Sequence, residues 1–266
     1  MSQHNNTLTS AVTGADILQI LQLTDLHLLS DPDQELWGTN TYRNFTRVLN
    51  MAIARYPRVD LLLLTGDLVH EPLAEAYFVL QKRLLDLPFP VYHLSGNHDD
   101  SSLISRCLKG GNIRSENVVR RGAWQIVLLD SNAPVASGGR LDGSQLQFLD
   151  RALTTHPDHY ALICLHHHPV PIRSSWMDAM ALVNPQQLFK VLDGHPRVRG
   201  IIWGHIHQEF ETERRGVRMM GAPATSIQFV PYCDRFAQDD LGPGFRWLGL
   251  HPDGHIETRV HYIDDD

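Results

Sequence analysis

The feature that most constrains this sequence is a series of short apolar runs, several of which end in aspartate, asparagine or histidine. The runs occupy residues 17–23, 60–64, 91–94, 124–129, 160–165 and 198–203. They are of strand length and rich in Leu, Ile and Val, a composition typical of strands covered on both faces. Segments with helical periodicity separate them, at residues 42–55, 73–85, 145–153 and 186–192. This alternation predicts an α/β fold.

After residue 204 the pattern changes, and two hairpins are expected. Residues 209–213 and 217–220 flank an Arg-Arg-Gly turn, and residues 247–250 and 256–260 flank Asp253-Gly254, a pair that predicts a type I′ turn. Apolar residues make up 42% of the chain, enough to bury a full core. We therefore expect an α/β, two-sheet β-sandwich flanked by helices, with a β-rich C-terminal part. Residues 16–266 form one domain behind a flexible tail of residues 1–15.

Local signals indicate where the helices begin. Pro72 and Pro185 are expected in the first turn of a helix, where a missing N–H costs little. Asp142 is expected to cap the helix at 145–153, and Asp99 to cap a helix that follows it.

Five of the apolar runs end in residue types that bind metals. The run ends read Asp25-Leu26-His27, Gly66-Asp67, Gly96-Asn97-His98-Asp99, His166-His167-His168 and Gly204-His205-Ile206-His207. Ligands of α/β sheets bind beyond the carboxyl ends of the strands, so we expect these run ends to form one site. The seven candidate ligands are Asp25, His27, Asp67, Asn97, His166, His205 and His207. Their carboxylate, amide and imidazole groups suit first-row divalent ions, and their number suits two ions that share a carboxylate.

These run ends resemble the motifs of the calcineurin-like metallophosphoesterase superfamily, which read D-x-H, G-D, G-N-H-[DE], H and G-H-x-H. All five are present and in order. The resemblance implies a two-sheet sandwich and a dinuclear metal centre, with Fe²⁺ or Mn²⁺ as first candidates and Zn²⁺ or Co²⁺ as alternatives. It implies that Asp25, His27 and His207 hold one ion, that Asn97, His166 and His205 hold the other, and that Asp67 bridges them.

The same resemblance implies a different part for His98. It would contact the phosphate and protonate the leaving oxygen, as an imidazole with a pKa near 6.5 can. Together with Asp67 it forms the predicted catalytic pair. The predicted contacts to substrate are His27, Asp67, Asn97, His98 and His207. We expect Gly66, Gly96 and Gly204 to allow the sharp exit from strand to loop.

Several further side chains keep two interpretations. His70 contacts either the substrate or its own loop, and His167 either supports the metal ligands or is structural. His168, before Pro169, is expected to shape its loop. Trp37 and Trp176 lie in loops that leave the ligand-bearing run ends, where they either wall a pocket for a base or have no such role. The remaining tryptophans, Trp124, Trp203 and Trp247, are expected in the core.

A narrower resemblance, to the bacterial class III cyclic-AMP phosphodiesterases, rests on the loops and the tail. Its segments are residues 129–131, 145–146, 166–171, 175–178, 184–185, 204–208, 222–229, 243–247 and 251–254, together with Gly139 and Leu141. It implies hydrolysis of 3′,5′-cyclic AMP to 5′-AMP by a metal-bridging hydroxide, which lowers cellular cyclic AMP. The alternative is a broader phosphodiesterase acting on 2′,3′-cyclic nucleotides or glycerophosphodiesters, because the metal motifs would serve either reaction.

Composition bounds the partners. A net charge of −7 argues against nucleic-acid binding, which depends on clustered Lys and Arg. Cys107, Cys164 and Cys233 form no disulfide or thiolate-metal pattern, which favours a reducing compartment. No apolar run approaches the roughly 18 residues of a membrane span. We therefore expect a cytoplasmic enzyme for a small cyclic nucleotide, with no membrane or nucleic-acid partner and with its oligomeric state open. A non-enzymatic relative would have lost ligands, and none is lost here.

Overall fold

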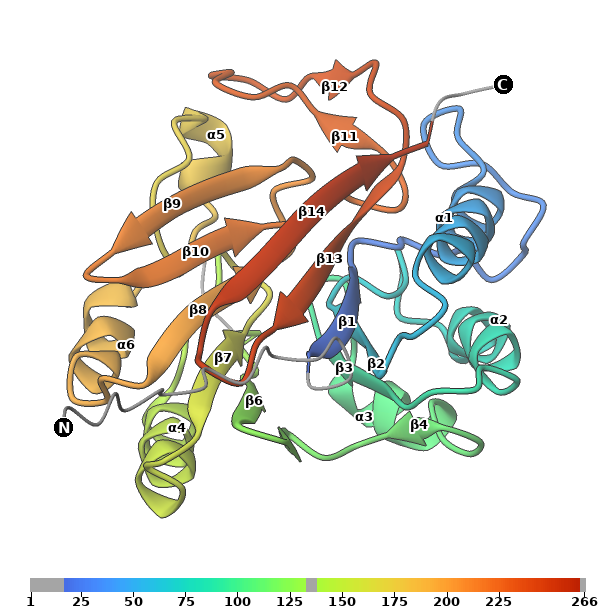
Figure 1. Ribbon diagram of the computed structural model, residues 1–266. Helices are drawn as coiled ribbons and strands as arrows, with labels where there is room; N and C mark the ends of the chain where they lie inside the picture. The colour runs from blue at the N-terminus through green and yellow to red at the C-terminus, as the bar shows by residue number, and fades with distance from the viewer. Residues whose placement is uncertain (1–16, 133–137, 264–266) are drawn as a thin grey trace, which may run out of the picture.

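The computed structural model describes residues 17–132 and 138–263. The predicted tail, residues 1–15, lies outside the described residues, so the division into a tail and one domain stays a prediction. The elements, drawn in Figure 1, are β1 (Leu18–Leu23), α1 (Thr41–Arg55), β2 (Leu61–Thr65), α2 (Ala74–Leu84), β3 (Val91–Leu94), α3 (Ser101–Cys107), β4 (Ile113–Arg114), β5 (Val118–Arg121), β6 (Trp124–Leu128), α4 (Gly143–Thr155), β7 (Tyr160–Cys164), α5 (Ser175–Asp178), α6 (Pro185–Leu192), β8 (Val198–Trp203), β9 (Phe210–Arg214), β10 (Val217–Gly221), β11 (Gln228–Phe229), β12 (Gln238–Asp239), β13 (Gly244–Leu250) and β14 (Ile256–Tyr262).

The longer strands build two sheets of six strands each. The first has the order β14-β13-β1-β2-β3-β4 and the second the order β5-β6-β7-β8-β10-β9, while β11 and β12 pair separately. In the first sheet β1 to β4 are parallel, and the β13–β14 hairpin joins them antiparallel to β1. In the second sheet β6, β7, β8 and β10 are parallel, with β5 and β9 antiparallel at the edges. The predicted fold class is confirmed.

The two sheets pack face to face, and helices cover their outer faces. Figure 1 shows α1 and α2 outside the first sheet and α4 and α6 outside the second. On β2, Leu61 and Leu63 point into the apolar layer between the sheets, whereas Leu62 and Leu64 belong to the layer that includes α1 and α2 residues. This alternation with period two buries both faces of the strand, which is why its sequence is continuously apolar.

Both predicted hairpins are present, as β9–β10 and β13–β14. The predicted type I′ turn at Asp253-Gly254 is wrong. The turn is closed by a 3.0 Å hydrogen bond from the Gly254 N–H to the His251 carbonyl, which places Pro252 and Asp253 at its centre. Gly254 takes a φ of 89°, and Asp253 is not among the residues with positive φ, whereas a type I′ turn requires positive φ at both central residues. Pro252 favours a turn centred on itself and Asp253, because its ring fixes φ near −65°.

The helix starts were predicted with mixed success. Pro185 is the first residue of α6, and Asp142 caps α4 by accepting a 2.9 Å hydrogen bond from the Gln145 N–H. Pro72 precedes α2 instead of lying in its first turn, because the carbonyl of Leu73 is the first to accept helical hydrogen bonds.

Within the described residues, no helix is both long and apolar enough to cross a membrane. The three cysteines are free.

Candidate active site

The structure brings the seven candidate ligands together at one end of the sandwich. They follow β1, β2 and β3 of the first sheet and β7 and β8 of the second. In two sets of three candidate ligands, one potential ligand atom from each residue lies within 4.8 Å of the others, and His27 forms a further such set with His70 and His98. The two sets of candidate ligands are Asp25, His27 and His207, and Asp67, His166 and His205. All six side chains are buried, whereas Asn97 is exposed and His98 half-buried.

Asp67 belongs to the second set and also faces His27 of the first. Its Oδ2 atom is 3.6 Å from His27 Nε2 and 3.3 Å from His166 Nε2. Its other oxygen, Oδ1, accepts a 2.9 Å hydrogen bond from the backbone N–H of His98. Asn97 Oδ1 lies 3.2 Å from His166 Nε2, on the same side as the second set. A carboxylate in this position can face two ions at once.

Hydrogen bonds to backbone carbonyls orient several of the imidazoles. Nδ1 of His166 lies 2.9 Å from the Thr65 carbonyl, and Nδ1 of His207 lies 2.8 Å from the Ile227 carbonyl. A carbonyl only accepts, so each Nδ1 donates, and Nε2 remains available as a ligand. In the first set, Nε2 of His207 lies 3.4 Å from Asp25 Oδ1 and 3.2 Å from Nε2 of His27.

An unpaired nitrogen atom supports the same interpretation. Among the ring nitrogens of the candidate ligands, His205 Nε2 is buried without a hydrogen-bond partner in the described part of the chain. Buried polar atoms in folded proteins normally have a partner. The unpaired Nε2 atom of His205, and the mixture of carboxylate, amide and imidazole donors around it, fit a site for first-row divalent ions.

Protonation states that suit metal binding are favoured at His27, His205 and Asp67 but not at His166. Burial lowers the pKa of His27 to about 3 and that of His205 well below its usual value. Burial would raise the pKa of Asp67, but the charge and hydrogen bond of His166 outweigh it and hold that pKa well below normal. Burial acts in the opposite direction on His166, where Asp67 raises the pKa to about 9. Carboxylates and neutral imidazoles are the ligating forms, so binding an ion at His166 releases a proton.

The backbone at the candidate ligands is strained. Five of them have left-handed backbone angles: Asp25 (φ 52°), His27 (φ 46°), Asp67 (φ 48°), His205 (φ 68°) and His207 (φ 47°). Hydrogen bonds hold them in place, since the N–H groups of Asp25 and His27 donate to the carbonyls of Gly66 and Asp67, both at 3.0 Å. The N–H of His205 donates to Asp25 Oδ2 at 2.9 Å. Such strain is typical of functional sites.

The three glycines before the ligands have two different functions. Gly66 adopts a φ of 97°, which permits the sharp exit expected from the sequence. At Gly96 and Gly204 the requirement is close packing, which corrects that expectation. A methyl group on Gly96 would collide with the Asp67 carboxylate, and one on Gly204 with Thr24 and Asp25.

Two histidine rings stand beside the cluster. The His98 ring lies 4.7 Å from the His27 ring, and the carbonyl of His70 accepts a 2.8 Å hydrogen bond from His98 Nδ1. The ring of His70 stacks on that of His98 at 5.1 Å and 24°. His70 therefore orients His98 through its backbone and its ring, while its contact with substrate stays a prediction.

His167 and His168 lie behind the second set. The ring of His167 is 4.7 Å from that of His205, and its Nδ1 atom is 2.8 Å from Ser131 Oγ. His168 Nε2 lies 3.4 Å from Asp178 Oδ1, a contact that ties its loop to α5. His167 thus packs against a candidate ligand, in accord with a supporting part.

The prediction that Asp99 caps a helix is wrong. Asp100 caps α3, by accepting hydrogen bonds from the N–H groups of the helix's second and third residues. Asp99 is buried and accepts hydrogen bonds from the Gly96 and Leu68 N–H groups and from the Tyr77 hydroxyl, at 2.9 to 3.2 Å. It therefore joins the loops that carry Asp67 and Asn97, a tertiary contact that outcompetes the local one.

A cavity of about 270 Å³ opens over the cluster. Trp37 and Trp176 line it, which agrees with the interpretation in which they wall a pocket. The other three tryptophans, Trp124, Trp203 and Trp247, are buried as expected. Its lining is His27, Trp37, Asp67, Asn97, His98, Trp176, Met177, Met180, His205, His207, Phe229 and Phe236. Sequence reasoning missed the two phenylalanines. Phe229 stacks on the ring of His207 at 4.0 Å and 9°, and no local pattern indicates this.

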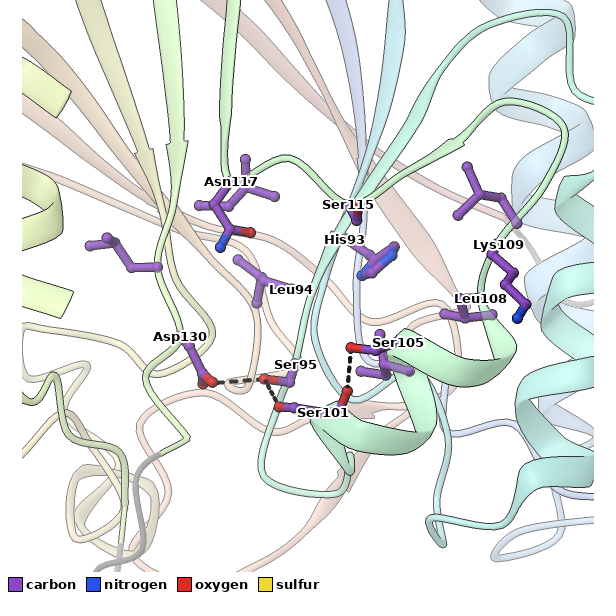
Figure 2. Close-up of a pocket in the computed structure, with 14 residues that line it drawn as sticks. His93, Leu94, Ser95, Ser101, Ser105, Leu108, Lys109, Ser115, Asn117 and Asp130 are labelled. Carbon is purple, nitrogen blue, oxygen red and sulfur yellow. Dashed lines mark hydrogen bonds between the residues drawn. The ribbon is translucent and has the colours of Figure 1, made fainter. Parts of the chain in front are cut away.

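A second cavity, of about 440 Å³, lies away from the ligands between β3, α3 and β6. Figure 2 shows its polar side chains, where Ser95 Oγ donates to Asp130 at 3.2 Å and Ser101 Oγ donates to Ser95 Oγ at 3.4 Å. It contains none of the seven candidate ligands.

Comparisons with known proteins agree with this arrangement. A model of the calcineurin-like phosphoesterase family matches residues 18–209. A 3′,5′-cyclic adenosine monophosphate phosphodiesterase CpdA from Pseudomonas aeruginosa is 39% identical over 265 residues, covering 100% of this chain and 96% of that protein. The protein of the same name from Escherichia coli strain K12 is 36% identical over 259 residues, covering 97% of this chain and 94% of that one.

A solved structure shares the fold. A dimetal phosphatase from Danio rerio superposes with a TM-score of 0.63 at 19% identity, covering 92% of this chain and 98% of that one. The family match covers the strands and loops that carry all seven candidate ligands. The chain therefore belongs to the calcineurin-like phosphoesterase family, and the resemblance found in its five motifs is confirmed.

Proposed function

We propose that this protein is a metal-dependent phosphodiesterase that hydrolyses 3′,5′-cyclic AMP to 5′-AMP and so lowers cellular cyclic AMP. The observation that carries the proposal is the position of Asp67, which belongs to one compact set of buried candidate ligands and faces the other set through His27, beneath an open cavity. The full-length similarity to proteins named cyclic-AMP phosphodiesterases supports the choice of substrate.

In this proposal two divalent ions bind at the cluster. Asp25, His27 and His207 would hold one ion, Asn97, His166 and His205 would hold the other, and Asp67 would be shared by both. Fe²⁺ or Mn²⁺ suits these mixed ligands best, and Zn²⁺ or Co²⁺ is the alternative. When bound, such a pair binds phosphate oxygens and lowers the pKa of a water molecule so that it can attack phosphorus.

The protein's own residues position the substrate and move a proton. Asn97 and His98 are the more exposed members of the site, so they meet the phosphate first. Nδ1 of His98 donates to the His70 carbonyl, which leaves Nε2 to carry the proton given to the leaving oxygen. Attack in line with the 3′ oxygen breaks the bond from phosphorus to that oxygen. The phosphate then stays on the 5′ oxygen.

Chromatography of the reaction products tests this function. Metal-loaded protein should convert 3′,5′-cyclic AMP to 5′-AMP, and its expression should lower cyclic AMP in cells. Formation of 3′-AMP would contradict the direction of attack. Faster turnover of 2′,3′-cyclic nucleotides or glycerophosphodiesters would favour the broader phosphodiesterase that the sequence left open. The predictions of a cytoplasmic location and of no nucleic-acid partner stay predictions.

A further inference from the structure

Trp37 occupies a turn that does not suit it. Leu36 and Thr39 exchange two backbone hydrogen bonds of 2.8 and 3.0 Å, and the residues between them, Trp37 and Gly38, have φ of 51° and 80°. Positive φ at both central residues is the signature of a type I′ turn, which favours Asn, Asp or Gly at the first of them. A bulky residue there is an outlier. The indole is also 53% exposed, so it gains little from burial in the core.

The turn places this indole beside the seven candidate ligands, called the ligand cluster below. The Trp37 ring lies 6.0 Å from that of His70, which stacks on His98. Trp37 also lines the cavity shared with His27 and His98. Because neither folding nor burial accounts for a tryptophan at this position, its position over the cluster points to a ligand.

Trp176 and Phe236 also line this cavity. Phe236 lies between the two tryptophans, with ring centres 5.4 Å from Trp37 and 5.6 Å from Trp176. It is carried by the loop between β11 and β12, which Figure 1 shows at the same end of the molecule as α5.

Two hydrogen bonds fix that loop to the start of α5. The N–H of Cys233 donates to Ser174 Oγ at 3.3 Å, and the hydroxyl of Ser175 donates to Asp234. Phe236 and Trp176 therefore belong to segments that are tied together, and Phe236 contacts Trp37.

The cavity has two chemically different parts. One part is the ligand cluster with its neighbour His98. The other is aromatic and apolar: Trp37, Trp176, Met177, Met180, Phe229 and Phe236. Of these, Trp37, Trp176 and Phe236 come from separate segments and offer faces and edges to a flat ring, which aromatic residues bind by stacking.

We propose that Trp37, Trp176 and Phe236 bind the base of a nucleotide whose phosphate lies at the ligand cluster. This inference rests on the proposed function only for the position of the phosphate. Trp37 is the stacking residue, and its strained turn holds the indole out over the site.

The substitution Trp37→Asn removes the indole and keeps a residue type that suits the turn. Asparagine suits the first central position of a type I′ turn, so the variant should fold at least as stably as the wild type. Binding of 5′-AMP and of ribose 5-phosphate, which lacks the base, is measured by calorimetry on metal-loaded protein. Loss of base stacking weakens binding by about 5- to 150-fold, so 5′-AMP affinity should fall by at least about fivefold. Affinity for ribose 5-phosphate should not change.

Two further variants complete the experiment. Trp37→Phe should recover part of the 5′-AMP affinity. Phe78→Ala removes a ring that is 50% exposed on α2, outside the cavity lining, and should change neither affinity. Equal weakening of both ligands by Trp37→Asn, or no weakening of either, would overturn the base site. Because binding is measured without turnover, absence of cyclic-AMP hydrolysis contradicts the proposed function alone.

Discussion

Replacing Asp67 with asparagine should remove most of the stability that the protein gains from metal ions. The substitution keeps the size of the side chain and the Oδ1 atom that accepts from the His98 N–H. It removes the negative charge that lies 3.6 Å from His27 Nε2 and 3.3 Å from His166 Nε2. Because Asp67 faces both candidate ion sites, one substitution should weaken both.

The expected magnitude follows from linkage between binding and folding. An ion at a hundredfold excess over its dissociation constant stabilises the folded state by about 2.7 kcal/mol, so two ions contribute about 5.4 kcal/mol. In a chain of roughly this size each kcal/mol moves the melting temperature by about 2–4 °C. Metal loading should therefore raise the melting temperature of the wild type by about 10–20 °C. For Asp67→Asn the rise should be below about 5 °C, because neither site keeps its shared ligand.

Calorimetric melting of metal-loaded and chelator-treated protein measures this rise, and mass spectrometry measures metal content. Comparing each variant with its own metal-free form removes the effect of the substitution on the fold itself. Asp130→Asn is the matched control, since Asp130 follows β6 and lies outside the seven candidate ligands. It should retain two ions and the full rise. Two ions and an undiminished rise in Asp67→Asn would refute the shared-ligand assignment.

Three other substitutions have definite expected outcomes. His98→Ala should keep its metal content yet lower kcat by about 10²–10⁴, with a smaller loss on a nitrophenyl ester whose leaving group needs no proton; equal losses in a kinetic comparison would remove the general-acid assignment. Burial lowers the pKa of His93 to about 4, below its unfolded value, so acid destabilises the folded state as pH falls from 6.5. Between pH 7.5 and pH 5 the free energy of unfolding, measured with urea, should therefore fall by about 2 kcal/mol less in His93→Gln than in the wild type. An equal fall in the two proteins would contradict this. Gly204→Ala should weaken metal binding by about 10- to 100-fold in a titration, because its methyl group would meet Asp25, whereas Gly143→Ala, in open space, should not.

The sheets and the location of the cluster could be predicted from the sequence because both depend on local patterns. Continuous apolar runs mark strands covered on two faces, and polar residues directly after them lie at the carboxyl edge of a parallel sheet. Asp142 and Pro185 were correctly placed at helix starts for the same reason, since a cap or a first-turn proline acts within one helical turn.

Two of the errors and omissions, at Asp99 and Phe236, involve contacts between distant segments. Asp99 resembles a helix cap in sequence, but its carboxylate accepts hydrogen bonds from Leu68 and Tyr77, which are distant in the chain. Phe236 reaches the cavity through the tethering of its loop to α5, which has no signature in spacing. The type I′ turn of Trp37 could not be predicted either, because its first central residue contradicts the preference for that turn.

Each set of candidate ligands combines residues that follow strands of both sheets, so the site depends on the packing of the core. His27 follows β1 in the first sheet and its neighbour His207 follows β8 in the second, while Asp67 follows β2 and its neighbour His166 follows β7. Each candidate ion would therefore join the two sheets, and each set exists only while the sheets are packed together. The apolar layer between them carries that packing, and it includes fully buried residues at the middle of β2 and β7. A cavity made in this layer would act at a distance on metal affinity, because the two halves of each ion site would no longer be held at one separation.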